Sequence, residues 1–421
     1  MKKNSLRKNF IWNLVGTTFN AFNSLFYMII VTRINGIKNA GIFSIAFATA
    51  CILYIIGIYA GRIYQVTEND KKITDKDYII SRVISCLLML IIGLLFIFIR
   101  GYNFYKSIIF ILLILYKLLE SFSEVLYAIM QKNNLLYKVG ISLFLKSIFS
   151  LLLFLITDLI TNNLYISCIS ILIVNILFII FYDFIVLNKI EYERFKYSKE
   201  SIIKIYTNGF FTFAIAFLGL YITNVSKYII DILLTEDIQA IFAIIIMPAT
   251  IVSLLAQFLI HPILNDIFEL YKLKKFKEFK QMLCKIILSL FTCGLLCSII
   301  GYFLGIPILE IIYGINLKKY SIHLFFVILS ATFYTMAGII SPFLITMRYT
   351  KVQFVYNLIC VILQTILTYI LVLKCGFNGA IISYCIVMIL YFIFFYFIAI
   401  KIINKVEKQE RIEVKWIYYI R

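Results

Sequence analysis

The feature that most constrains this chain is a series of apolar blocks separated by short basic stretches. Each block has about 20 residues or more, the length that a helix needs to cross roughly 30 Å of hydrocarbon. Of the 421 residues, 63% are hydrophobic and 14% are charged, whereas soluble domains are roughly half apolar and a quarter charged. The sequence therefore predicts an all-α polytopic membrane protein and excludes a water-soluble enzyme.

The apolar blocks predict twelve transmembrane helices, at residues 10–31, 40–63, 82–99, 107–130, 139–157, 164–187, 205–230, 238–264, 283–304, 322–346, 352–373 and 379–403. We expect an N-terminal six-helix lobe (1–187), a cytoplasmic linker (188–204), a C-terminal six-helix lobe (205–404) and a cytoplasmic tail (405–421). Because both lobes begin on the same side of the membrane, they are predicted to form a parallel repeat around a central cleft.

The distribution of Lys and Arg predicts the orientation of the chain. With the N-terminus inside, the inner segments and the inner ends of the spans, which carry Arg62, Arg82, Lys285 and Lys401, hold 30 of these residues, and the outer segments hold 7. This bias places both termini in the cytoplasm. The net charge of +19 then reflects topology and contact with anionic lipid headgroups, so no nucleic-acid partner is expected. The nine cysteines show no metal-ligand spacing, and neither a metal nor a cofactor is expected.

Ionisable residues inside the predicted spans are the candidate functional residues, because such groups usually face the bundle interior or a wet cavity. We single out Lys117, Glu120 and Glu124 in span 107–130, Lys146 in span 139–157, Lys227 in span 205–230 and Asp231 at the outer end of that span.

Two interpretations of these residues stay open. In the structural one they pair with each other, for example Lys117 with Glu120 or Glu124, and only hold helices together. In the functional one, four cations line the cleft and bind an anionic headgroup: Arg62, Lys117, Lys146 and Lys227. The carboxylates Glu120, Glu124 and Asp231 are then candidates for proton or cation coupling.

Several motifs resemble the start of the Wzx-type polysaccharide flippases of the multidrug/oligosaccharidyl-lipid/polysaccharide (MOP) exporter superfamily. They are Ala40-Gly41-Ile42-Phe43-Ser44, Gly61-Arg62 with Tyr64-Gln65-Val66-Thr67, and Asp77-Tyr78 with Arg82. Two further patterns are similar to later spans of that family: Lys117, Glu120-Ser121, Ser123-Glu124, Tyr127 and Gln131-Lys132, and then Lys227-Tyr228 with Ile241-Phe242. The resemblance extends from the first to the eighth span.

The chain also departs from the family pattern. Ser226-Lys227-Tyr228 stands where the family tends to have Pro-Arg-Tyr, and Ala240 replaces an expected glycine. Lysine keeps the positive charge but lacks the bidentate geometry of arginine.

The resemblance implies a flippase of a bacterial inner (plasma) membrane that works by alternating access. It would move undecaprenyl-diphosphate-linked oligosaccharide repeat units from the cytoplasmic to the outer leaflet, for O-antigen, capsule or exopolysaccharide. The implied partners are this lipid-linked oligosaccharide, membrane lipids, and the polysaccharide polymerase with its chain-length machinery.

Three alternatives remain. A cation-coupled drug or small-molecule exporter of the same superfamily would use the acidic residues. A membrane-embedded glycosyltransferase or polymerase would need a sizeable extramembrane loop with catalytic motifs, and the loops here are short and mainly Lys-bearing. A purely structural role is disfavoured by ionisable residues on three separate spans.

Overall fold

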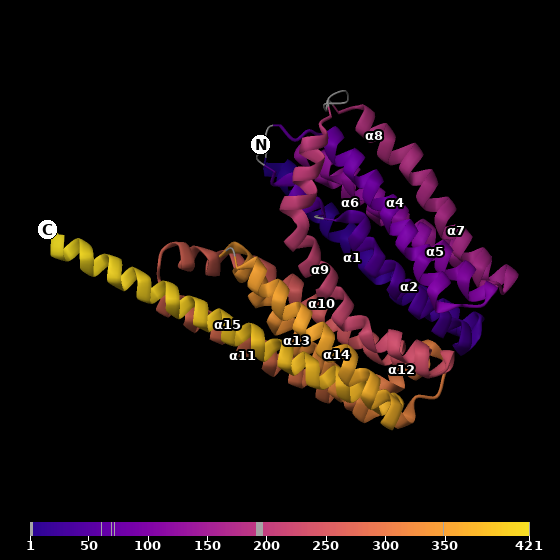
Figure 1. Ribbon diagram of the computed structural model, residues 1–421. Coiled ribbons are helices and arrows are strands. Elements are labelled where there is room, and N and C mark those ends of the chain that lie inside the picture. Colours follow the sequence, from indigo (N-terminus) through magenta and orange to yellow (C-terminus); the bar gives the residue numbers. More distant parts are fainter. Residues whose placement is uncertain are drawn as a thin grey trace. The chain divides into compact units, whose positions relative to one another are not determined.

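The computed structural model describes residues 3–59, 61–68, 70, 72–190, 197–347 and 349–420, and every regular element in them is helical. The helices of the first half (Figure 1) are α1 (Lys3–Ile34), α2 (Gly36–Ile58), α3 (Gly61–Val66), α4 (Asp75–Arg100), α5 (Phe104–Lys132), α6 (Leu136–Thr161), α7 (Leu164–Phe178), η1 (Ile179–Asp183) and α8 (Phe184–Asn188). Those that follow are α9 (Lys199–Leu233), α10 (Glu236–Lys272), α11 (Phe276–Ile300), η2 (Gly301–Gly305), α12 (Ile306–Tyr313), η3 (Lys318–Tyr320), α13 (Ser321–Thr346), α14 (Thr350–Cys375) and α15 (Phe377–Ile420).

The lengths of these helices fit a membrane-spanning protein. Within the described residues, 11 stretches are long and apolar enough to cross a bilayer. Helix α5 is 29 residues long and contains the predicted span 107–130, but it is not among these eleven because Lys117, Glu120 and Glu124 place three charged residues in that span. The predicted all-α polytopic fold class is therefore confirmed.

The helices group into two compact units. The first comprises Met1–Tyr221 and Thr235–Ala240, and the second comprises Ile222–Leu234 and Ile241–Arg421. Helix α9 therefore contributes residues to both units. The lobe, linker and tail boundaries given above stay predictions.

In the first unit, close backbone contacts require glycine. A Cβ atom on Gly16 of α1 would overlap the carbonyl group of Gly140 on α6, and a Cβ on Gly140 would overlap the carbonyl of Trp12. A Cβ on Gly41 of α2 would likewise overlap the carbonyl oxygen of Glu236, in the first turn of α10. Small residues at these three places let the helix backbones touch, as is common in membrane bundles.

A capping box starts α4 and also holds the beginning of α9. The Thr74 hydroxyl accepts from the backbone N–H of Asp77, whose carboxylate accepts from the backbone N–H of Thr74 at 2.8 Å. The same carboxylate, fully buried, accepts from the backbone N–H of Ser198 at 2.8 Å. Asp77 thus satisfies two of the amide groups that helix starts leave without partners.

Helix α2 ends where the backbone leaves helical geometry, a few residues before Arg62. Tyr59 has a φ of +48°, in the left-handed region that a tyrosine rarely adopts, and Gly61 follows with a φ of +77°. Near this end of α2, the backbone carbonyl of Gly57 accepts a hydrogen bond from Nη1 of Arg82 on α4 at 3.0 Å. The short helix α3 starts after the break and carries Arg62.

The second unit holds its interior together with uncharged polar groups. Gln364 on α14 donates to the hydroxyls of Ser226 and Thr368, at 3.3 and 3.0 Å, and Thr368 contacts Ser383 of α15 at 2.9 Å. All four side chains are buried. These hydroxyl groups and the amide nitrogen of Gln364 therefore bond to uncharged partners in the interior of the second unit.

Candidate functional site

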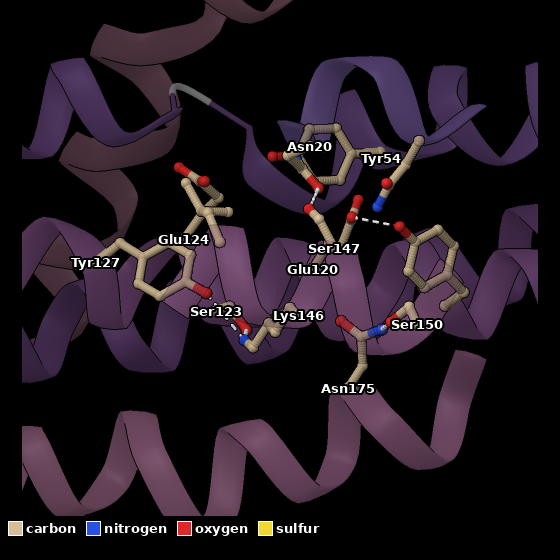
Figure 2. Close-up of a pocket in the computed structure, with 13 residues that line it drawn as sticks. Asn20, Tyr54, Glu120, Ser123, Glu124, Tyr127, Lys146, Ser147, Ser150 and Asn175 are labelled. Atoms are coloured by element: carbon tan, nitrogen blue, oxygen red, sulfur yellow. Dashed lines mark hydrogen bonds between the residues drawn. The ribbon is translucent and has the colours of Figure 1, made fainter. Parts of the chain in front are cut away.

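A polar pocket lies inside the first unit, among α1, α2, α5, α6 and α7 (Figure 2). It has an empty volume of about 380 Å³, counting the space at its open mouth. Its lining consists of amide, hydroxyl and ionisable side chains with one leucine: Asn20, Asn23, Tyr54, Tyr116, Glu120, Ser123, Glu124, Tyr127, Leu143, Lys146, Ser147, Ser150 and Asn175. Three of the residues predicted from sequence, Glu120, Glu124 and Lys146, therefore line one pocket.

Lys146 forms a fully hydrogen-bonded ion pair. Its ammonium group lies 2.6 Å from Oδ2 of Asp183, and it donates to the hydroxyls of Ser123 and Tyr127, each at 2.9 Å. Figure 2 shows Lys146 reaching from α6 towards Ser123 on α5. Ser142 closes the ring, since it donates to the other oxygen of Asp183 at 2.7 Å and lies 3.0 Å from the Tyr127 hydroxyl. Lys146 is 6% exposed and Asp183 is 0% exposed, so partners replace the water that both ions have lost.

Asp183 is not among the functional residues predicted from the sequence. It is the last residue of η1, a π-helical turn between α7 and α8, and such turns are frequent at functional sites because they change which residues face inwards. A signal for it was present, because Asp183 is an acidic residue inside the predicted span 164–187. The rule that found Lys146 applies equally to this aspartate.

Lys117 and Glu120 form a second pair on α5. Lys117 Nζ contacts Glu120 Oε2 at 2.5 Å, and the Tyr116 hydroxyl donates to the other Glu120 oxygen at 2.7 Å. The same ammonium group lies 5.0 Å from the ring centroid of Phe47 and 4.9 Å from that of Tyr116. Aromatic faces attract cations, so rings and carboxylate together stabilise the charge.

Arg62 and Glu124 form a third and looser pair. Arg62 Nε lies 3.6 Å from Glu124 Oε2, and the two side chains are 19% and 18% exposed. Among the described residues, the buried Nη1 of Arg62 has no hydrogen-bond partner. The pair brings α3, just after the break in α2, against the pocket wall on α5.

Lys227 and Asp231, the remaining predicted residues, lie on the part of α9 that belongs to the second unit. Both are partly buried and both take part in contacts. Their grouping with the cations of the first unit stays a prediction.

In and around the pocket, the first unit therefore holds three cations and three carboxylates as ion pairs. An anion that bound one of these cations would have to compete with its carboxylate partner. The amides and hydroxyls of the lining can exchange hydrogen bonds with water or with the hydroxyl groups of a sugar. In the described part of the chain, no group of three or more His, Cys, Asp or Glu side chains could hold a metal ion.

Comparison of the sequence with known proteins identifies one related protein of described function. No protein-family profile matches the chain. The capsular polysaccharide biosynthesis protein CapF of Staphylococcus aureus is 25% identical over 377 residues, which are 89% of this chain and 94% of CapF.

Two solved structures share the architecture. An inward-facing multidrug resistance MATE family transporter of the MOP superfamily has a TM-score of 0.71 and 13% identity, over 94% of this chain and 99% of that one. The lipid II flippase MurJ, in an inward closed conformation, has a TM-score of 0.69 and 17% identity, over 97% of this chain and 93% of that one. The chain has the fold of MOP-superfamily transporters, which confirms the resemblance seen in its motifs.

Proposed function

We propose that this multi-pass membrane protein is a flippase for undecaprenyl-diphosphate-linked oligosaccharide repeat units in the assembly of a surface polysaccharide. It moves them by alternating access from the cytoplasmic to the outer leaflet of a bacterial inner (plasma) membrane, with both of its own termini in the cytoplasm. The observation that carries the proposal is the sequence relation to a capsular polysaccharide biosynthesis protein over nearly the full length of both chains. A transporter fold with ionisable groups buried in a pocket supports it.

The proposed residue roles follow the chemistry of the substrate. A diphosphate headgroup is recognised by cations, and we assign this role to Arg62, Lys117, Lys146 and Lys227. Glu120, Glu124 and Asp231 are proposed to couple transport to a proton or another cation. The lining amides and hydroxyls, such as those of Asn20 and Ser147, suit the hydroxyl groups of the glycan.

We further propose that the protein is a transporter and not an enzyme. The reaction that builds the repeat unit would precede its action on the cytoplasmic side. The polysaccharide polymerase with its chain-length machinery would follow on the outer side. Its partners would then be the lipid-linked oligosaccharide, the surrounding lipids and that machinery.

Deletion of the gene, with two glycan pools followed together, tests this proposal. We expect surface polysaccharide to be lost while complete undecaprenyl-linked units accumulate in the cytoplasmic leaflet, and the wild-type gene to restore both pools. Incomplete units in both pools would contradict the proposal and indicate a defect in synthesis. Unchanged pools would favour the cation-coupled exporter of drugs or small molecules.

A further inference from the structure

The three ion pairs of the first unit differ in how firmly they are held. Lys146 and Asp183 share direct hydrogen bonds with each other and with three hydroxyl groups. Lys117 and Glu120 are in direct hydrogen-bond contact, and Tyr116 holds the glutamate from its other oxygen. Arg62 and Glu124 approach only to 3.6 Å, and no hydrogen bond joins them in the structure. Arg62–Glu124 is therefore the pair that costs least to separate.

Arg62 has hydrogen-bond donors that Glu124 does not satisfy. A guanidinium group offers five N–H donors in a planar fork, and the paired oxygens of a carboxylate or phosphate match this geometry. Its buried Nη1 has no partner in the described residues, and its side chain is 19% exposed. A phosphate group matches this fork better than the single distant oxygen of Glu124 does.

The fate of Glu124 after separation depends on the groups around it. Charged or titratable side chains face it from four neighbouring helices and from its own: Tyr54 on α2, Arg62 on α3, Arg82 on α4, Lys146 on α6, and Glu120 and Tyr127 on α5. Lys146 is already bound to Asp183, and Arg82 already donates to the Gly57 carbonyl. Once Arg62 is taken by a phosphate, the same pocket would hold an added negative charge. A poorly hydrated carboxylate under those conditions is stabilised by protonation.

We propose that Arg62–Glu124 is an exchangeable ion pair, in which a phosphate group of the substrate displaces Glu124 from Arg62 and the freed carboxylate takes up a proton. The proton comes from water, and no other bond is made or broken. Substrate binding and proton uptake thus become one event. This inference rests on the proposed function for the presence of a phosphate-bearing substrate, and it deepens that function by assigning the coupling ion to one residue.

The test measures proton uptake during binding. The full chain in lipid nanodiscs is titrated with undecaprenyl diphosphate by calorimetry, in buffers that differ in ionisation enthalpy, and inorganic pyrophosphate serves as a second probe without lipid. We expect about one proton to be taken up per diphosphate bound by the wild type. Failure of pyrophosphate to compete would assign recognition to the lipid-borne group, whereas competition would assign it to the phosphates themselves. Either result is compatible with exchange at Arg62.

Variants separate exchange from a structural role. Glu124→Gln is expected to abolish proton uptake and to bind the diphosphate several-fold more tightly, because Arg62 no longer has a competing anion. Arg62→Ala is expected to weaken binding by on the order of tenfold or more, and Arg62→Lys to restore part of the affinity. Asp75→Asn is the matched control, since it removes a carboxylate with nearly the same exposed fraction, 17%, from an ion pair with Lys132 outside the pocket, and it should leave the proton count unchanged.

Infrared difference spectra give a second readout that does not depend on affinity. The bound wild type should show the band of a protonated carboxyl group, and Glu124→Gln should lack it. Proton uptake that persists in Glu124→Gln, or that disappears in Asp75→Asn, would overturn the inference. Binding without proton uptake would also overturn it, as expected if Glu124 turned to Arg82 and stayed charged, yet would leave the flippase proposal intact. A wild-type chain that binds neither probe would overturn both.

Discussion

At the scale of single residues, Lys146 and Asp183 can both stay ionised in the interior of the first unit because they pair with each other. Either ion without its partner would be left in a site with almost no water. Lys146→Met and Asp183→Asn are each expected to lower the free energy of unfolding by about 3–5 kcal/mol, while the double variant loses less than the sum of the two. Thermal unfolding in detergent measures this cycle. Additive losses would show that the two side chains do not stabilise each other.

Residue chemistry also shows what could be predicted from sequence. An ionisable residue in an apolar span is visible without a structure, and Lys117, Glu120, Glu124 and Lys146 were found in that way. Their partners were not fixed, because Lys117 can reach either glutamate along a helix and Lys146 pairs across helices with Asp183 through a π-helical turn. Hydropathy and spacing carry no information on such a turn. The long separation of Arg62 and Glu124, 3.6 Å, could not be predicted from the sequence either, because it depends on the non-helical backbone after α2.

At the scale of helices, Gly41 sets the contact between α2 and the first turn of α10. A Cβ atom there would overlap the backbone carbonyl oxygen of Glu236, which no side-chain rotation can relieve. Gly41→Ala is therefore expected to destabilise the fold by about 1–3 kcal/mol. Gly338→Ala on α13 is the matched control, because nothing lies within 4 Å of its added Cβ, and alanine is favoured over glycine in a helix by about 1 kcal/mol. Equal melting temperatures for the two variants would contradict this account of Gly41.

The start of α9 gives a second prediction at this scale. Asp77 accepts hydrogen bonds from the first turn of α4 and from the N–H of Ser198. Asp77→Ala removes both, so we expect a loss of about 1–2 kcal/mol and faster protease cleavage near Ser198. Limited proteolysis with mass spectrometry measures the effect. Cleavage at the wild-type rate would show that Asp77 does not hold α9.

At the scale of the whole molecule, the excess of basic residues predicts which ends of the helices face the cytoplasm. Cys375 is the last residue of α14, on the predicted outer side, and is exposed. Lys275 precedes α11 on the predicted inner side and is also exposed. In a chain whose sole cysteine is Cys375, an impermeant maleimide should label intact cells. In a chain whose sole cysteine comes from Lys275→Cys, labelling should require permeabilised cells. The reverse pattern would invert the topology.

The fold class and the family resemblance were within reach of the sequence because apolar block length and short motifs determine them. The division into two units was not, since α9 and α10 each contribute residues to both. A hydropathy profile places helix ends but does not say which helices pack together. For the same reason the joint role of Lys227 with the first-unit cations stays a prediction.

The central claim is translocation itself, and reconstitution tests it most directly. The purified chain is placed in proteoliposomes that contain undecaprenyl-diphosphate-linked oligosaccharide, and an impermeant glycosidase is added outside. We predict that the whole lipid-linked pool becomes cleavable with the wild-type chain, and that cleavage of the inner-leaflet share slows markedly with Arg62→Ala. If the glycosidase reached only the outer-leaflet share with wild-type protein, as in protein-free vesicles, the account would be contradicted.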